Sequence, residues 1–164
     1  KFRHCPWSGQ SPFSVQATSA MSQSTSPNEI EVRAAVRSDL PALGRFITQF
    51  VEQNRLLPRT KNELKELIPF GFVACQDGKL LGFAALEIYS SKLAEIRSLA
   101  VALEVQGRGV GKRLVRKCVE LAESRNVLEV MAITSTDEFF RACGFDFTLP
   151  GEKKALFIQT RDEV

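Results

Sequence analysis

The feature that most constrains the fold is a glycine-rich loop between an alternating strand pattern and a basic, helix-forming segment. Residues 94–120 read AEIRSLAVALEVQGRGVGKRLVRKCVE, with Gly107, Gly109 and Gly111 in the loop. The first N–H groups of a helix lack intrahelical partners, and the helix dipole is positive there, so this end attracts anions. Glycines let backbone N–H groups approach such an anion closely. The loop therefore predicts a phosphate-bearing ligand.

Two common phosphate-binding loops do not fit this stretch. A Walker A loop needs G-x-x-x-x-G-K-[ST], whereas Gln106 occupies the first glycine position and Arg113 replaces the hydroxyl residue. A dinucleotide-binding loop needs G-x-G-x-x-G and an acid at a strand end, whereas Glu129 lies inside the next expected strand. A glycine turn that binds nothing is the remaining alternative, but it gives no reason for the basic start of the helix.

The composition suits a single globular domain. The chain has 164 residues, of which 44% are hydrophobic, and a net charge of +3. It has no apolar run of membrane-spanning length, so we expect no membrane partner. Its basic helix residues lie opposite an apolar helix face, which is typical of the solvent-exposed side of an amphipathic helix. We therefore expect no nucleic-acid partner. These residues are Lys112, Arg113, Arg116 and Lys117.

The four cysteines are scattered, and no C-x-x-C motif occurs. The single histidine, His4, lies in a polar leader far from them. We therefore expect no metal site, reduced thiols and a cytoplasmic location. The cysteines are Cys5, Cys75, Cys118 and Cys143.

Residues 1–29 differ in composition from the rest of the chain. They are rich in Ser, Thr, Gln and Pro, and no acidic residue precedes Glu29. Such a segment buries little apolar surface, so we expect a flexible extension before a folded domain over 30–164. A natural start at Met21 behind an upstream extension is our interpretation. A transit peptide, which would place the protein in an organelle, is the alternative.

Periodicity and turn signals predict an α/β (α+β) sandwich, with a mostly antiparallel, twisted sheet flanked by helices in the order βααβββαβαββ. The expected elements begin with a strand from Ile30, a helix over 38–53 capped by Ser38, and a short helix capped by Thr60 and Glu63. A hairpin around Asp77-Gly78, a strand over 93–102, a helix over 110–124 and a strand over 127–134 follow. The last elements are a helix with a capping box of Ser135 and Glu138 that ends at Gly144, and closing strands over 145–149 and 155–160. Strict alternation places Glu95, Arg97, Leu99 and Val101 on one face of their strand.

The loop, with its flanking strand and helix, resembles the acyl-CoA signature of the GNAT acetyltransferase superfamily. The matching pattern is Gln106, Gly109 and Gly111, and the resemblance runs from Ile30 to Thr160. More narrowly, LPRTKNELKELIPF, AEIRSLAV and LPGEKKALF resemble the acetyltransferase domain of N-acetylglutamate synthases. This resemblance implies acetyl-CoA as co-substrate. It also implies transfer of the acetyl group to a small amine, namely the α-amine of an acidic amino acid such as glutamate.

The resemblance also implies where the coenzyme lies. The strand over 93–102 would splay from its neighbour, the pantetheine would pair with its backbone, and an N–H near Leu99 would stabilise the oxyanion. The diphosphate would lie on the N–H groups of residues 107–112. The expected coenzyme-binding residues are Leu99, Ala100, Val101, Gln106, Gly107, Arg108, Gly109, Val110, Gly111, Lys112 and Phe140.

The attacking amine must lose a proton, and Glu95 is our candidate base, acting through water. A structural ion pair with Arg97 is the alternative role for this carboxylate. Many members of the family carry a tyrosine acid where this chain has Phe140. Thr134 is therefore our candidate acid, on the resemblance, and Cys143 is a second option. The only tyrosine, Tyr89, ends a strand that need not reach the site.

Three basic residues are candidates for binding the acceptor's carboxylates. They are Arg59 of LPRT, Arg97 and Lys154, and arginine pairs bidentately with carboxylate. Each can instead be a solvated surface charge. The segment KKALF departs from the R-Q-x-x-Y of the synthases, which weakens the assignment to glutamate itself.

Three further alternatives stay open at the level of sequence. The chain can acetylate a protein N-terminus or lysine, which an acidic or open groove beside Glu95 would favour. It can be a non-catalytic acyl-CoA sensor, an alternative raised by Phe140 in place of tyrosine. A homodimer is as compatible with the sequence as a monomer.

Overall fold

The computed structural model describes residues 29–147, which form a five-stranded sheet flanked by helices. The elements are β1 (Glu31–Ala34), α1 (Leu40–Glu52), α2 (Lys61–Leu67), β2 (Gly71–Gln76), β3 (Lys79–Ile88), β4 (Leu93–Val101), α3 (Val110–Ser124), β5 (Glu129–Met131) and α4 (Asp137–Arg141). The strands lie in the order β1-β2-β3-β4-β5, antiparallel except for the β4–β5 pair. The predicted class and the element order through α4 are confirmed.

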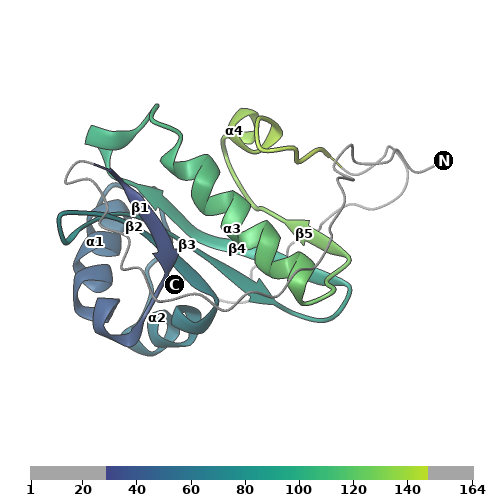
Figure 1. Ribbon diagram of the computed structural model, residues 1–164, viewed down its shortest axis with the longest axis horizontal. Helices are drawn as coiled ribbons and strands as arrows, with labels where there is room; N and C mark the ends of the chain where they lie inside the picture. Colours follow the sequence, from purple (N-terminus) through teal and green to yellow (C-terminus); the bar gives the residue numbers. More distant parts are fainter. Residues whose placement is uncertain (1–28, 148–164) are drawn as a thin grey trace, which may run out of the picture.

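The sheet lies between α3 on one side and α1 and α2 on the other (Figure 1). Strand β3 is central and is buried on both faces from Leu81 to Leu86. A Cβ added to Gly82 would lie 3.0 Å from the Leu114 side chain of α3. The absence of a side chain at Gly82 therefore lets α3 pack directly against the strand that precedes the candidate site.

The predicted β2–β3 hairpin is confirmed. Asp77 and Gly78 both have positive φ angles, 49° and 75°, as the tight turn between antiparallel strands requires. A second turn follows β3, closed by a hydrogen bond of 3.0 Å from the Tyr89 N–H to the Leu93 carbonyl. This turn brings the end of β3 beside the start of β4.

The predicted cap of α2 is also confirmed. The Thr60 hydroxyl accepts the Glu63 N–H at 3.2 Å, and the Glu63 carboxylate accepts the Thr60 N–H at 2.6 Å. Two N–H groups that the helix leaves unpaired are thereby satisfied. The cap fixes where α2 begins, and hence the position of Arg59 just before it.

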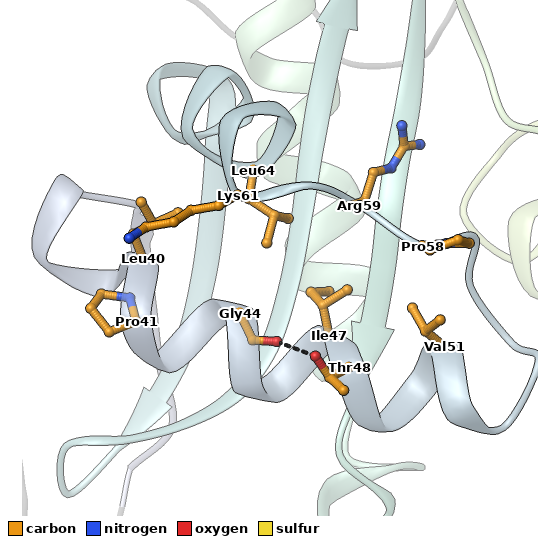
Figure 2. Close-up of a pocket in the computed structure, with 10 residues that line it drawn as sticks. All are labelled: Leu40, Pro41, Gly44, Ile47, Thr48, Val51, Pro58, Arg59, Lys61 and Leu64. Atoms are coloured by element: carbon orange, nitrogen blue, oxygen red, sulfur yellow. Dashed lines mark hydrogen bonds between the residues drawn. The ribbon is translucent and has the colours of Figure 1, made fainter. Parts of the chain in front are cut away.

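Replacing Thr60 by alanine is expected to lower the free energy of unfolding by about 1 kcal/mol, because an N-cap acceptor is lost. Thr48→Ala is the matched control. The Thr48 hydroxyl donates to the Gly44 carbonyl inside α1 (Figure 2), and that bond caps nothing. We expect a change within about 0.5 kcal/mol for the control. Urea denaturation of both variants checks this, and equal losses would contradict the capping role.

The helix starts differ from two predictions. Asp39, rather than Ser38, precedes α1, because its carboxylate accepts the Val36 N–H at 2.8 Å and pairs with Arg33 at 2.7 Å. The hydrogen bond from Arg33 lowers the pKa of Asp39, so the Asp39 carboxylate that makes these contacts is ionised at neutral pH. A 3-10 turn over Arg37–Asp39 results, and α1 begins one residue later. Similarly, Thr136 precedes α4 and the predicted Ser135 box is wrong.

The last predicted elements are shorter than expected or lie outside the description. Strand β5 covers only Glu129–Met131 of the expected 127–134. Residues 145–147 are not in a strand, and residues 148–164, with most of the two closing strands, lie outside the described residues. Within residues 29–147 no helix combines the length and apolarity that crossing a bilayer needs.

Candidate functional site

The site begins where β4 and β5 separate. The parallel pairing runs only from Leu93 opposite Glu129 to Glu95 opposite Met131, whereas β4 continues to Val101. Among the described residues, no strand pairs with this edge of β4 beyond Glu95. The open edge offers backbone donors and acceptors to an extended ligand.

Strand β4 carries a β-bulge at the same place. Arg97 lies opposite Ala85 and Ala100 lies opposite Phe83, so Ser98 and Leu99 together oppose one residue of β3. Ser98 has a positive φ of 55°, which a non-glycine residue adopts only under local constraint. A bulge disrupts the hydrogen-bond ladder and bends the strand.

The bulge overturns the expectation that Val101 shares a face with Glu95 and Arg97. Directly opposed residues of an antiparallel pair lie on the same face. Val101 opposes Gly82, on the face that α3 covers, whereas Glu95 opposes Glu87 on the other face. The extra residue shifts the alternation by one, which a sequence pattern alone cannot reveal.

The glycine loop leaves the first turn of α3 without a cap from any described residue. Gly107 and Gly109 both have φ angles of 76°, and Gly109 precedes the helix without a side-chain hydrogen bond. In the part of the chain that the structure describes, no hydrogen bond is donated by the N–H groups of residues 109–112. The first bond of the helix runs from the Arg113 N–H to the Gly109 carbonyl at 3.0 Å. Four unpaired amides therefore point out of the helix start.

Neighbouring residues tie this helix start to the open strand edge. The Gln106 side chain donates to the Val101 carbonyl at 3.0 Å. A Cβ added to Gly111 would lie 3.1 Å from the Phe139 ring and 3.6 Å from Val101. Phe139 of α4, which sequence reasoning missed, therefore packs against the first turn of α3. The helix start and the open edge of β4 form one continuous region.

Several predicted residues have clear structural positions. Phe140 is 9% exposed and packs edge-on against Phe139 and Phe145, so its ring belongs to the core. The Thr134 hydroxyl is exposed and accepts the Thr136 N–H at 3.0 Å in the turn before α4. Lys154 lies outside the described residues.

The structure also shows the environments of Cys143, Cys118 and Arg113. Burial raises the pKa of the Cys143 thiol, and nearby Lys112 acts in the opposite direction. Burial raises the pKa of Cys118 to about 12. Arg113 donates to the Ile30 carbonyl at 2.8 Å, so it ties α3 to the start of β1. In the described residues no cluster of His, Cys, Asp or Glu could hold a metal ion.

Glu95 is the buried acid of the site, at 6% exposure. Its Oε2 accepts the Tyr89 hydroxyl at 2.5 Å and the Arg97 guanidinium at 3.3 Å. Arg97 also contacts the Tyr89 oxygen at 3.0 Å and the Glu87 carboxylate at 2.9 Å. Burial alone would lower the pKa of Arg97, but Glu95, Tyr89 and Glu87 outweigh it and raise the value. The ion pair with Arg97, which the sequence raised as the alternative role of Glu95, is present at 3.3 Å.

Tyr89 reaches Glu95, which its place at a strand end left open at the level of sequence. The turn after β3 pairs Ile88 with Ala94 and Glu87 with Glu95, so Tyr89 follows the same strand pair. Alternation puts it on the face of Glu87. Alternation along β3 was readable in the sequence, but placing Tyr89 beside Glu95 also needs the geometry of the turn that follows β3.

Arg59 and Arg97 line one cavity of about 400 Å³ between α2 and the β3–β4 strands. Glu63, Glu66 and Glu87 line it as well. Arg59 is nearly buried, with a side-chain exposure of 15%, and its nearest carboxylate, Glu63, is 3.8 Å away. Its Nε is buried and has no hydrogen-bond partner among the described residues. Arg59 is therefore the incompletely paired cation of this cavity.

A neighbouring cavity of about 380 Å³ lies between α1 and α2. Its walls include Ile47 and Val51 of α1 and Leu64 of α2. Figure 2 shows the Arg59 guanidinium turned away from the α1 side chains. Arg59 therefore lines both cavities, and its charged end lies away from the α1 wall of this one.

Comparisons with known proteins show what this chain is similar to. The family model described as Acetyltransferase (GNAT) family matches residues 40–145. An uncharacterized N-acetyltransferase of Chlorobaculum tepidum is 35% identical over 114 residues, 70% of this chain and 74% of that protein. The amino-acid acetyltransferase of Mycobacterium tuberculosis is 32% identical, over 70% of this chain and 67% of that protein.

A solved structure extends the comparison to ligands. N-acetylglutamate synthase from Neisseria gonorrhoeae, complexed with coenzyme A and N-acetyl-glutamate, is 30% identical with a TM-score of 0.64. The match covers 70% of this chain but only 27% of that longer protein. This chain thus spans about a quarter of the synthase that it resembles.

Proposed function

The chain belongs to the acetyltransferase (GNAT) family, and we propose that it moves an acetyl group from acetyl-CoA to the α-amine of an acidic amino acid such as glutamate. The observation that carries the choice of acceptor is the cavity lined by both Arg59 and Arg97. Arg97 contacts the buried carboxylate of Glu95 at 3.3 Å. An amino acid whose carboxylate is held in this cavity has its α-amine near Glu95, the proposed base.

The proposed coenzyme site combines the uncapped start of α3 with the open edge of β4. The N–H groups of residues 109–112 would hold the diphosphate, since four convergent donors and a helix dipole suit its charge. Lys112 adds a positive charge there. Among the described residues, nothing lies within 4 Å of a Cβ added at Gly107 or Gly109, so the space beside the loop is open to a ligand. The predicted contacts that line this path are Leu99, Ala100, Val101, Gln106, Arg108 and Val110.

The proposed chemistry has three parts. Glu95 takes a proton from the substrate ammonium, through water, so that the nitrogen gains a free lone pair. A backbone N–H at the Ser98–Leu99 bulge stabilises the negative oxygen that forms when the amine attacks the thioester. Thr134 remains our proposed proton donor to the thiolate, a modest requirement because thiols ionise near pH 8.5.

Lys154 and Phe140 are also proposed to take part in the site, Lys154 on the resemblance alone and Phe140 on its packing. Lys154 is proposed to contact the acceptor, as the resemblance implies. Phe140 is proposed to shape the site through Phe139, against which it packs at 5.2 Å between ring centroids. Phe139 in turn supports the first turn of α3.

A second acceptor class has an observation in its favour. Glu63, Glu66 and Glu87 line the same cavity as the two arginines. Acidic side chains there suit a cationic amine, such as a lysine side chain or a protein N-terminus. Free amino acids and short peptides must therefore be compared directly.

Release of free thiol from acetyl-CoA tests the proposal. The panel consists of glutamate, aspartate, glutamine, lysine, arginine and a lysine-containing peptide. We expect glutamate or aspartate to give the highest kcat/KM. Preference for lysine or peptide would transfer the assignment to the second class. Coenzyme A binding without turnover of any amine would support a non-catalytic acyl-CoA sensor instead.

A further inference from the structure

Tyr89 stands out because its hydroxyl, rather than its ring, is what the fold holds in place. The residue is 48% exposed, so packing of the ring does not explain its position. Its oxygen nevertheless lies 2.5 Å from Oε2 of Glu95, whose side chain is 8% exposed. Tyr89 is thus half-exposed, yet its hydroxyl, the one polar atom of its side chain, hydrogen-bonds to the buried Glu95.

The two oxygens of the Glu95 carboxylate are not equivalent. Oε2 accepts both Tyr89 and Arg97, whereas Oε1 accepts no hydrogen bond from the described residues. An oxygen that already accepts two donors is the poorer proton acceptor of the pair. A proton arriving at Glu95 is therefore directed to Oε1.

Arg97 alone would hold Glu95 less well. Its NH1 lies 2.9 Å from the Glu87 carboxylate and 3.3 Å from Glu95, so Glu87 is the closer acceptor. Tyr89 bridges the gap by accepting from Arg97 at 3.0 Å while donating to Glu95. Burial is the main cause of the raised pKa of Tyr89, and the hydrogen bond to Glu95 is the second. The hydroxyl therefore keeps its proton near neutral pH.

We propose that Tyr89 is a positioning residue for catalysis: it fixes Oε2 of Glu95 and leaves Oε1 as the oxygen that receives the substrate's proton. This inference rests on the proposed function, in which Glu95 is the base. The other charged groups of the surroundings are Glu87 and Arg97 from the strands, and Arg59, Glu63 and Glu66 from the segment around α2.

Tyr89→Phe removes the hydroxyl and keeps the ring. We expect kcat to fall about tenfold, the loss typical of one hydrogen bond to a charged group, with little change in KM for either substrate. The acid limb of the kcat/KM profile should move to higher pH, because a donor that stabilises the ionised carboxylate is gone. Ser90→Ala is the matched control, since the Ser90 hydroxyl accepts the Lys92 N–H in the same turn, and the described hydrogen bonds of Glu95 come from Tyr89 and Arg97 instead. It should leave both quantities unchanged.

Titration of the Glu95 carboxyl by carbon NMR, assigned with Glu95→Gln, provides a readout that needs no activity. Protonation at higher pH in Tyr89→Phe than in the unmodified protein supports the inference. An unchanged midpoint overturns it, as does a loss of kcat without any displacement of the acid limb. If the unmodified protein turns over no amine, the proposed function fails, and the NMR titration still decides whether Tyr89 controls the carboxylate.

Discussion

Glu95→Gln is expected to lower kcat by about 10²- to 10³-fold, because the amide cannot accept the proton that the attacking ammonium must lose. Affinity for coenzyme A should hardly change, since Glu95 lies at the end of the β4–β5 pairing and not at the start of α3. Glutamine keeps the shape of the side chain and an acceptor oxygen for Tyr89. Steady-state thiol release and calorimetric titration with coenzyme A measure the two quantities.

Glu87→Gln is the control for this substitution. Glu87 also binds Arg97, at 2.9 Å, but its side chain is 42% exposed and lies directly opposite Glu95 on β3. An exposed ion pair contributes little, so a loss below about fivefold is expected. Full activity of Glu95→Gln would contradict the role of the base and leave Glu95 as the buried partner of Arg97.

Arg59→Ala is expected to raise KM for the acidic amino acid by about 10- to 100-fold, which is the effect of losing a charge-assisted hydrogen bond to a carboxylate. The structural reason is that the buried Nε of Arg59 has no partner within residues 29–147, and its contact with Glu63 is long, at 3.8 Å. KM for acetyl-CoA should stay unchanged. Steady-state kinetics with each substrate varied in turn separates the two constants.

Two variants sharpen this prediction. Arg59→Lys keeps the charge but loses the planar fork, so it should recover only part of the affinity. Lys61→Ala removes an exposed cation two residues further along, which lines the other cavity, and should have no effect on KM. A rise in KM for acetyl-CoA in Arg59→Ala would place Arg59 at the coenzyme and overturn its assignment to the acceptor.

Local signals in the sequence were enough to predict much of the fold. Helix α3 covers residues 110–124 as predicted, because its apolar spacing is regular and a glycine precedes it. The capping pair of Thr60 and Glu63 and the Asp77-Gly78 turn were readable for the same reason: each depends on residues adjacent in the chain. These are features in which local preference and fold agree.

The missed features depend on contacts between distant segments. The bulge at Ser98 arises from the register of β4 against β3, and it overturned the expected face of Val101. Asp39 replaced Ser38 at the start of α1 because Arg33 of β1 binds its carboxylate. Strand β5 is short because β4 diverges from it beyond Glu95. For the site, alternation placed Glu95 beside Arg97, but the cluster with Tyr89 required the turn geometry.

The central claim is that the backbone N–H groups at the start of α3 hold the diphosphate of the coenzyme. Calorimetric titration with coenzyme A, dephospho-coenzyme A and pantetheine tests it most directly, because dephospho-coenzyme A lacks only the 3′-phosphate, whereas pantetheine lacks the diphosphate together with the adenosine. We predict that the two diphosphate compounds bind with similar affinity and pantetheine at least about 100-fold more weakly. Equal affinity for pantetheine and coenzyme A would contradict the claim.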